Sequence, residues 1–456
     1  MFKRQIHKEL DKWLENPHRK PLIIRGARQV GKTTLVHQFA RQFEQYIYLN
    51  LEISADKDPF LRYRDLEELV QSIFFIKDQQ LSKRENTLIF IDEIQEVPAV
   101  LNILRYFYEQ EPKIKVIAAG SMLESVFDQT VHFPVGRVEY KVLRPVSFPE
   151  FLDALAEHSA LEQLLHVPLR PFAHERLIRL YHKYAIIGGM PEVLNAYLRN
   201  KDYNDIKPVF DSLIAAYLDD VEKYAKNDTQ VLHLRHVIRS SFSEAGKRIH
   251  FAGFGNSSYR SREMSECLRL LEKVLLLKLL FPNTSATLPL QADLKKSPRL
   301  QILDTGMLNH FVGIQKEILT ADDLSNVYQG AMIEHLTGQE LLANQYHALS
   351  ELYFWVKEKK ESNAEVDFLY PFEGKLIPVE TKSGRAGTLK SLHQFMDLAP
   401  HQMAVRFYAG PISINEAKTP LKKTYHLLNL PYYLVSQINP YLLWFQEEIH
   451  RKKQLD

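Results

Sequence analysis

Gly26-Ala27-Arg28-Gln29-Val30-Gly31-Lys32-Thr33 is the stretch of this sequence that decides the fold of its first domain. It matches the pattern GxxxxGK[ST], follows a short apolar run at residues 22–24 and precedes a helix-like segment at residues 34–43. In that setting the glycines let backbone N–H groups turn towards phosphates, and the helix N-terminus adds its positive dipole end. The stretch predicts the phosphate-binding loop of a nucleoside triphosphatase; a glycine turn without a ligand is the alternative.

The residues of this loop have distinct expected tasks. The Lys32 ammonium should reach the β- and γ-phosphates and take part in catalysis, and the Thr33 hydroxyl should coordinate magnesium. We expect nucleotide contacts from Gly26, Ala27, Arg28, Gln29, Val30, Gly31, Lys32, Thr33 and Thr34.

Hydrolysis also needs a carboxylate for the magnesium and a base for the attacking water. Residues 88–93 read LIFIDE, so a buried strand delivers Asp92 to the carboxyl edge of a sheet, where ligands bind in α/β folds. Asp92 is the expected magnesium ligand, and Glu93 is the expected catalytic base. The alternative is that these are ordinary acidic residues at a strand end.

A further strand, at residues 115–121, ends in Ser121. Its hydroxyl is a candidate catalytic group that orients water or contacts the γ-phosphate. An N-cap of the following segment, residues 122–127, is an equally good and compatible interpretation.

Apolar runs at residues 22–24, 46–51, 88–91 and 116–119 alternate with amphipathic stretches, which predicts a parallel α/β sheet in a P-loop ATPase core over residues 1–147. The spacing of apolar residues then becomes helical. The prediction for the rest of the chain is a helical lid at 148–226, a winged-helix-like unit at 227–298, a separate α/β domain at 299–425 and a C-terminal tail at 426–456.

Two local features of these later segments have competing interpretations. Gly188-Gly189-Met190-Pro191 interrupts the helical lid and is typical of a helix-ending turn. The winged-helix-like unit carries cations that could contact nucleic-acid phosphates, but interleaved glutamates favour a solvated face with ion pairs. The cations are Arg260, Arg262, Arg269 and Lys273, and the glutamates are Glu263, Glu266 and Glu272.

The composition indicates a globular protein of several domains: 456 residues, 45% hydrophobic and 25% charged. With 58 Lys plus Arg against 56 Asp plus Glu, any contact with a polyanion must be a local patch. The single cysteine, Cys267, excludes an internal disulfide and a Cys-rich zinc site and favours the cytoplasm. No apolar stretch approaches the length of a membrane span, and the N-terminus lacks the pattern of a signal peptide.

The segments GARQVGKTTL, LIFIDEIQEVP, AAGSML, VGRVEYKVLRPVSFPEFL and IIGGMP occur in that order. In them the chain resembles, over nearly its whole length, the prokaryotic AAA+ ATPases that pair an AAA_14 domain with a DUF4143 domain. The resemblance implies ATP as the nucleotide. It also implies that Arg137 is a catalytic arginine finger, within one subunit or across the interface of a homo-oligomer. Pairing of Arg137 with a local carboxylate such as Glu139 is the alternative.

The same resemblance implies a PD-(D/E)xK nuclease-like fold for the C-terminal domain. A hairpin symmetric about Glu373-Gly374 would place Asp367 opposite Glu380, with Lys382 on the same face. Two facing carboxylates suggest a second Mg²⁺ or Mn²⁺ between them, and Lys382 would steady the attacking water. Glu334 matches the helix-borne acid of this pattern. An inert hairpin with charged residues on its wet face is the alternative.

A few residues of the C-terminal domain remain outside this pattern. Asp304 matches a family position, and helix capping is its expected role. Arg385 and Lys390 add positive charge near Lys382 and give only a weak indication of phosphate binding.

Two functions of different classes follow from these features. The first is an ATP-driven machine that acts on nucleic acid, DNA rather than RNA, through the nuclease-like domain. The second is an NTP-dependent switch with a protein partner and an inert C-terminal domain. Stimulation of ATP turnover by nucleic acid discriminates between them.

Overall fold

The structure is a computed structural model that describes residues 2–120, 136–320, 324, 330–357, 364–381 and 389–455. The apolar runs of the first domain form the predicted parallel sheet, with the strand order β2-β3-β4-β1-β5. β3 is buried at every residue, because helices cover both of its faces. The strands are β1 (Leu22–Arg25), β2 (Gln45–Asn50), β3 (Thr87–Asp92), β4 (Lys115–Gly120) and β5 (Glu139–Val142).

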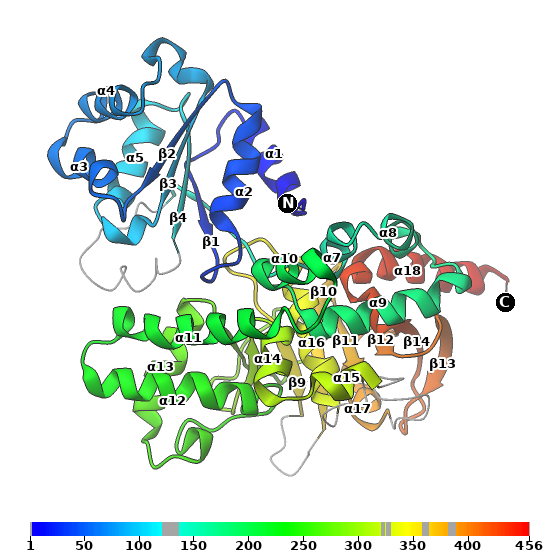
Figure 1. Ribbon diagram of the computed structural model, residues 1–456. Coiled ribbons are helices and arrows are strands. Elements are labelled where there is room, and N and C mark those ends of the chain that lie inside the picture. Colours follow the sequence, from blue (N-terminus) through cyan, green and yellow to red (C-terminus); the bar gives the residue numbers. More distant parts are fainter. Residues whose placement is uncertain are drawn as a thin grey trace.

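Helices lie on both faces of this sheet (Figure 1). Successive residues of β1 point to opposite faces: Leu22 and Ile24 pack with α1 and α2, whereas Ile23 packs with α3, α4 and α5. The helices are α1 (His7–Glu15), α2 (Lys32–Phe39), α3 (Ser54–Arg62), α4 (Leu66–Ile76) and α5 (Val100–Gln110).

The chain is helical after residue 147, as its apolar spacing predicts, and it remains mainly helical up to residue 320. The helices are α7 (Phe148–Ala154), α8 (His158–Leu165), α9 (His174–Ile187), α10 (Pro191–Asn200), α11 (Lys207–Tyr224), α12 (Asp228–Glu244), α13 (Ser261–Lys273), α14 (Thr305–Val312) and α15 (Gln315–Thr320).

One strand lies in a different unit from the one the sequence suggests. β8 (Arg299–Ile302) was expected to begin the C-terminal α/β domain, but it pairs antiparallel with β6 (Leu277–Leu280) and completes a two-stranded sheet. This small sheet follows the packed helices α12 and α13. The apolar pattern of β8 shows that a strand exists there, but the pattern does not identify its partner.

The C-terminal half is built on a mixed sheet of seven strands in the order β13-β14-β12-β11-β10-β9-β7. Its strands are β7 (Pro282–Asn283), β9 (Tyr353–Val356), β10 (Glu365–Phe372), β11 (Lys375–Thr381), β12 (Met403–Tyr408), β13 (Ser413–Lys418) and β14 (Thr424–Pro431). The associated helices are α16 (Ala331–Ala343), α17 (Lys390–Leu398) and α18 (Ile438–Leu455).

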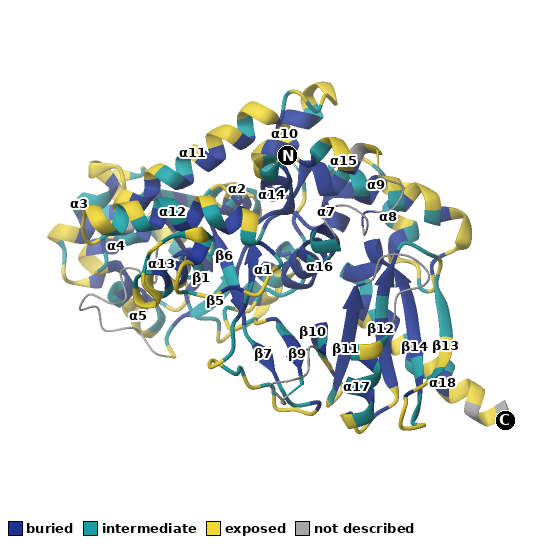
Figure 2. Cartoon of the chain, turned by 90° about the horizontal axis from the view of Figure 1, so that it is seen from below, coloured by how far each residue is buried: buried dark blue, intermediate teal, exposed yellow. Residues whose placement is uncertain are grey.

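Residues 426–456, expected to be a tail, belong to this domain. β14 lies between β12 and β13 in the sheet, and α18 buries Tyr441, Leu442 and Phe445. Figure 2 shows the strands of this sheet largely in the dark blue of buried residues. Removing these side chains from water stabilises the segment, so it is an integral part of the fold.

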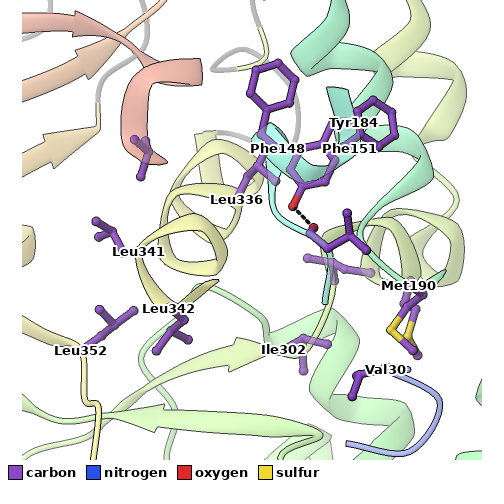
Figure 3. Packing of buried hydrophobic residues seen from close by; sticks show 14 of the residues in the cluster. Val30, Phe148, Phe151, Tyr184, Met190, Ile302, Leu336, Leu341, Leu342 and Leu352 are labelled. Atoms are coloured by element: carbon purple, nitrogen blue, oxygen red, sulfur yellow. Dashed lines mark hydrogen bonds between the residues drawn. The ribbon is translucent and has the colours of Figure 1, made fainter. Parts of the chain in front are cut away.

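A single large cluster of buried side chains connects the first domain to the rest of the molecule. It includes Val30 of the phosphate-binding loop, Met190 before α10, Tyr184 of α9 and Leu336 of α16, which Figure 3 shows together. The expected phosphate-binding loop is therefore packed against the C-terminal two-thirds of the chain. Among the described residues, no helix combines the length and the apolar character that crossing a bilayer requires.

Candidate active site

The phosphate-binding loop connects β1 to α2, as its sequence predicts. Gln29 and Gly31 have φ values of 64° and 95°, and such turns direct successive N–H groups to one side. A β-carbon on Gly26 would lie 2.6 Å from the carbonyl oxygen of Leu143, which follows β5. Glycine at position 26 is therefore required for the loop to pass the end of β5.

Lys32 begins α2 and is buried within the loop. Its Nζ donates hydrogen bonds to the carbonyl oxygens of Gly26 and Ala27, at 3.0 and 3.1 Å. Burial lowers the pKa of the Lys32 ammonium, while the nearby Glu93 and Asp92 carboxylates act in the opposite direction. The Lys32 side chain is thus held inside the cradle that the loop forms.

The two expected magnesium ligands meet at the carboxyl edge of the sheet. The Thr33 hydroxyl donates a hydrogen bond of 2.6 Å to Oδ2 of Asp92, at the end of β3. Asp92 is buried, and this burial raises the pKa of its carboxyl group. A hydroxyl and a carboxylate are hard oxygen donors, so this pair fits a magnesium ion.

Glu93 follows Asp92 with a φ of 53°, a left-handed conformation that is rare for a residue other than glycine. Its side chain is half-buried, and its Oε2 accepts a short hydrogen bond from the Gln95 amide. Backbone strain of this kind clusters at functional sites. Glu93 thus follows the buried Asp92 and lies close enough to Lys32 for the two charges to interact.

Several residues that hold the loop have no signature in the sequence. Arg4 donates to the carbonyl oxygen of Val30 at 3.2 Å, and Tyr217 of α11 donates to that of Arg28 at 2.7 Å. The Arg28 guanidinium forms an ion pair with Asp220, also on α11. These partners are separated from the loop by long stretches of chain, and only the tertiary fold brings them together.

Of the remaining expected catalytic residues, Arg137 is not at this site, and Ser121 cannot be placed because it is outside the part of the chain that the structure describes. The backbone N–H of Glu139, two residues after Arg137, donates a hydrogen bond to the carbonyl oxygen of Pro21, just before β1. Arg137 therefore lies near the start of β1. The phosphate-binding loop follows the other end of this strand. Four strand residues separate these two edges by roughly 13 Å. Arg137 pairs with Glu109 of α5 at 2.9 Å rather than with Glu139. Ser121 lies outside the described residues; β4, which precedes it, ends at Gly120.

The break at residues 188–191 is a helix-ending turn, as predicted, and it also touches the loop. α9 ends at Ile187 and α10 begins at Pro191. A β-carbon on Gly31 would lie 3.6 Å from Cγ of Pro191. Asp304 caps α14 through Met307 N–H, as expected, and accepts a 2.6 Å bond from the Gly189 N–H. Burial raises the pKa of Asp304 to about 6.

The C-terminal hairpin has the predicted register. Phe368 pairs with Val379 and Phe372 with Lys375, which places Asp367 opposite Glu380. Both carboxylates are buried. Lys382 and Arg385 lie outside the described residues, and Lys390 is exposed at the start of α17.

A cation that the sequence analysis did not anticipate, Arg299 of β8, lies among the expected metal ligands. It forms ion pairs with Glu334, Asp367 and a further acid, Glu365. Burial opposes the charged form of Arg299, but these three carboxylates raise the pKa of its guanidinium overall. The residues present do not fit the expected second metal, because the guanidinium uses oxygens of Glu334 and Asp367, two of its expected ligands. Within the described residues, no group of three or more His, Cys, Asp or Glu is arranged to hold a metal.

Comparison with protein families gives three matches. An AAA domain (AAA_14) matches residues 18–152, a domain of unknown function (DUF8612) matches residues 178–318, and a domain of unknown function (DUF4143) matches residues 329–433. The second match begins within the expected lid at residue 178, covers the whole winged-helix-like unit and includes β8. No curated protein matches the chain.

Among solved structures, the chain is similar to the Walker-type ATPase PABY2304 of Pyrococcus abyssi. The two share 16% sequence identity with a TM-score of 0.44, over 68% of this chain and 96% of that chain. The AAA_14 match covers the phosphate-binding loop, Asp92 and Glu93, and the DUF4143 match covers Glu334, Asp367 and Glu380. The chain is thus a P-loop ATPase of the AAA type in which an AAA_14 domain is followed by a DUF4143 domain.

Proposed function

We propose that the chain binds ATP with magnesium at residues 26–33 and hydrolyses it with Glu93 as the base. The observation that carries this proposal is the 2.6 Å contact between Thr33 and Asp92, which joins the loop to the end of β3. Magnesium, when bound, neutralises phosphate charge. The chain's own residues supply Lys32 for the phosphates, the oxygens of Thr33 and Asp92 for the ion, and the Glu93 carboxylate for a water proton.

Two substitutions separate binding from hydrolysis. Lys32→Ala should lose ATP affinity, because it removes the cation of the cradle. Glu93→Gln should bind ATP normally but turn over about 100- to 10,000-fold more slowly, the usual contribution of a general base. Fluorescent ATP binding and single-turnover hydrolysis measure the two effects.

A matched control is Glu96→Gln. Glu96 is an exposed glutamate three residues after Glu93, and it pairs with Lys57. The turnover of this variant should equal that of the unchanged protein. Normal turnover in Glu93→Gln would show that another group activates the water.

Nucleic acid, DNA rather than RNA, is the partner we propose for this ATPase. The support is α13 (Ser261–Lys273), which buries one face against the protein. It exposes Arg262 and Arg269, and Arg260 is exposed at its N-cap; the buried residues are Met264, Cys267, Leu268 and Leu271. Arg262 pairs with Glu266 at 3.1 Å, so its charge is partly compensated. Duplex DNA should raise the ATPase rate more than RNA does, and Arg260→Gln with Arg269→Gln should reduce this stimulation. An ATPase rate unchanged by either nucleic acid would refute the proposal.

The observation at Arg299 favours one part of the second candidate function, the switch with a protein partner: its inert C-terminal domain. A centre in which a guanidinium neutralises the carboxylates lacks the arrangement that metal-dependent cleavage needs. Labelled DNA and RNA should stay intact with Mg²⁺ or Mn²⁺. Cleavage that disappears in Glu380→Ala would contradict this inert role.

The position of Arg137 supports only one form of the arginine-finger proposal. Because Arg137 lies at the edge of the sheet remote from its own loop, it would have to act on a neighbouring subunit of a homo-oligomer. Sedimentation with ATP should then show assembly, and Arg137→Ala should hydrolyse slowly. A monomer with full activity would exclude this arrangement.

A further inference from the structure

Three carboxylates from two elements converge on one guanidinium in the C-terminal half of the molecule. Nη1 of Arg299 lies 3.5 Å from Oε2 of Glu334 on α16, and Nη2 lies 3.5 Å from Oδ1 of Asp367 on β10. Nη2 also contacts Oε1 of Glu365, two residues before Asp367. The Arg299 side chain is only 12% exposed, so these charges interact with little screening by solvent.

The surroundings of the guanidinium complete its coordination. The ring of Phe354 on β9 has its centroid 4.9 Å from Cζ of Arg299, a cation–π contact. The second oxygen of Asp367, Oδ2, accepts hydrogen bonds from the N–H and the hydroxyl of Thr381, at 2.7 and 2.8 Å. Both oxygens of Asp367 are therefore already used within the protein.

A divalent cation would need the same carboxylate oxygens. It would also lie within a few ångströms of a positive charge that is fixed on β8, and like charges at that distance repel strongly in a partly buried site. The two cations are thus alternatives for one position.

We propose that Arg299 takes the place of a divalent cation in this centre, so that the DUF4143 domain holds its acidic residues together without a metal. Because β8 pairs with β6 and the acids lie on α16 and β10, the cluster ties the small two-stranded sheet to the seven-stranded sheet. Its role is to join two parts of the molecule, and it is not a centre for phosphodiester hydrolysis.

The test compares the full-length protein with Arg299→Gln, without nucleotide, in EDTA and in Mn²⁺. The unchanged protein should melt at the same temperature in both conditions. Arg299→Gln should melt several degrees lower in EDTA, because three carboxylates lose their counter-charge, and Mn²⁺ should restore much of that loss. Electron paramagnetic resonance should count one more bound Mn²⁺ per chain in Arg299→Gln than in the unchanged protein.

Three control variants assign the effect to this cluster. Arg248→Gln removes a more exposed guanidinium that lies 3.7 Å from Glu365 alone, and it should gain no Mn²⁺. Arg299→Lys keeps the positive charge and should also gain none. Glu334→Gln added to Arg299→Gln should abolish the gained Mn²⁺. The phosphate-binding loop is the same in all variants, so any ion that binds there cancels from the comparison.

Two results would overturn the proposal. One is Mn²⁺ bound by the unchanged protein and lost in Asp367→Asn. The other is a folded Arg299→Gln that gains no Mn²⁺. If Arg299→Gln does not fold, the Mn²⁺ counts of the unchanged protein and of Asp367→Asn still test the proposal. No nucleotide is used, so these outcomes are independent of the proposed ATPase activity.

Discussion

A single residue of the phosphate-binding loop, Arg28, connects the loop to helix α11. Its guanidinium pairs with Asp220, and its carbonyl oxygen accepts from the Tyr217 hydroxyl. Tyr217 and Asp220 are three residues apart and so lie on one face of α11. The second carboxylate oxygen of Asp220 is buried without a hydrogen-bond partner in the described structure. A buried carboxylate therefore neutralises a cation of the phosphate-binding loop.

We expect Asp220→Asn to bind ATP about 3- to 10-fold more tightly, roughly 1 kcal/mol, because it removes a negative charge and frees Arg28 for the phosphates. Titration with a fluorescent ATP analogue measures the change. Asp219→Asn is the matched control, since Asp219 is exposed on the same helix. Weaker binding by Asp220→Asn would show instead that Asp220 positions Arg28 for the nucleotide.

At the scale of elements, the corner between α9 and α10 holds the first domain against the rest of the chain. Val146, just before α7, donates a 2.7 Å hydrogen bond to the Gly189 carbonyl, and Gly189 donates to Asp304. A β-carbon at position 189 would lie 2.3 Å from the Val146 carbonyl oxygen. The corner therefore needs glycine because two backbones approach closely.

Gly189→Ala should destabilise the protein by about 2 to 4 kcal/mol, since neither backbone can move away without losing its hydrogen bonds. Gly136→Ala is the control: Gly136 has a φ of 72°, and no atom of the described residues lies within 4 Å of an added β-carbon, so only the backbone penalty of about 1 kcal/mol is expected. Thermal melting should therefore show a larger loss for Gly189→Ala. Equal losses would mean that the close approach relaxes easily.

At the scale of the whole molecule, Glu340 of α16 joins the C-terminal half to α7 and α9. Its carboxyl group accepts from the Phe148 N–H at 3.0 Å and from the Tyr184 hydroxyl at 2.8 Å. Burial raises the pKa of Glu340 from its ordinary 4.5 to about 8, and the Glu150 carboxylate adds to the increase, while the two hydrogen bonds oppose it. The folded protein therefore binds a proton at Glu340 at neutral pH.

The pKa of this carboxyl group is higher in the folded state than in the unfolded state. At pH values between the two, the folded protein binds more protons than the unfolded protein does. The contribution of this group to stability is therefore present below about pH 4.5 and is lost as the pH rises to about 8. Two other buried groups titrate lower: the pKa of Asp304 is raised to about 6, and that of His335 is lowered by burial to about 3. Between pH 6.5 and 8, Asp304 is mostly ionised in both states. His335 still contributes there through its unfolded pKa near 6.5, but its effect has the opposite sign and fades by about pH 7.5, so the fall in stability belongs to Glu340.

We expect the free energy of unfolding of the unchanged protein to fall between pH 6.5 and 8, by up to about 1.4 kcal/mol per pH unit. Its melting temperature should fall accordingly. Glu340→Gln keeps an oxygen acceptor for Phe148 and Tyr184 but does not titrate, so its melting temperature should change much less. Glu162→Gln, at an exposed position of α8, should behave like the unchanged protein. An equal slope in Glu340→Gln would assign the pH dependence to another group.

The sequence by itself determined the elements and the site that depend on local pattern. The loop at residues 26–33 and the four apolar runs specify their own conformation through glycine and hydrophobic periodicity. The turn at Glu373-Gly374 fixes the register that places Asp367 opposite Glu380, because side chains in a hairpin alternate with a period of two.

Only the tertiary structure decided which distant residues meet. The pairing of β8 with β6, the place of β14 inside the sheet and the contact of Asp220 with Arg28 join segments whose patterns carry no record of their partners. Arg299 shows the physical reason most clearly. Its sequence context is that of an ordinary strand residue, and burial beside Glu334, Glu365 and Asp367 turns it into the counter-ion of an acidic centre.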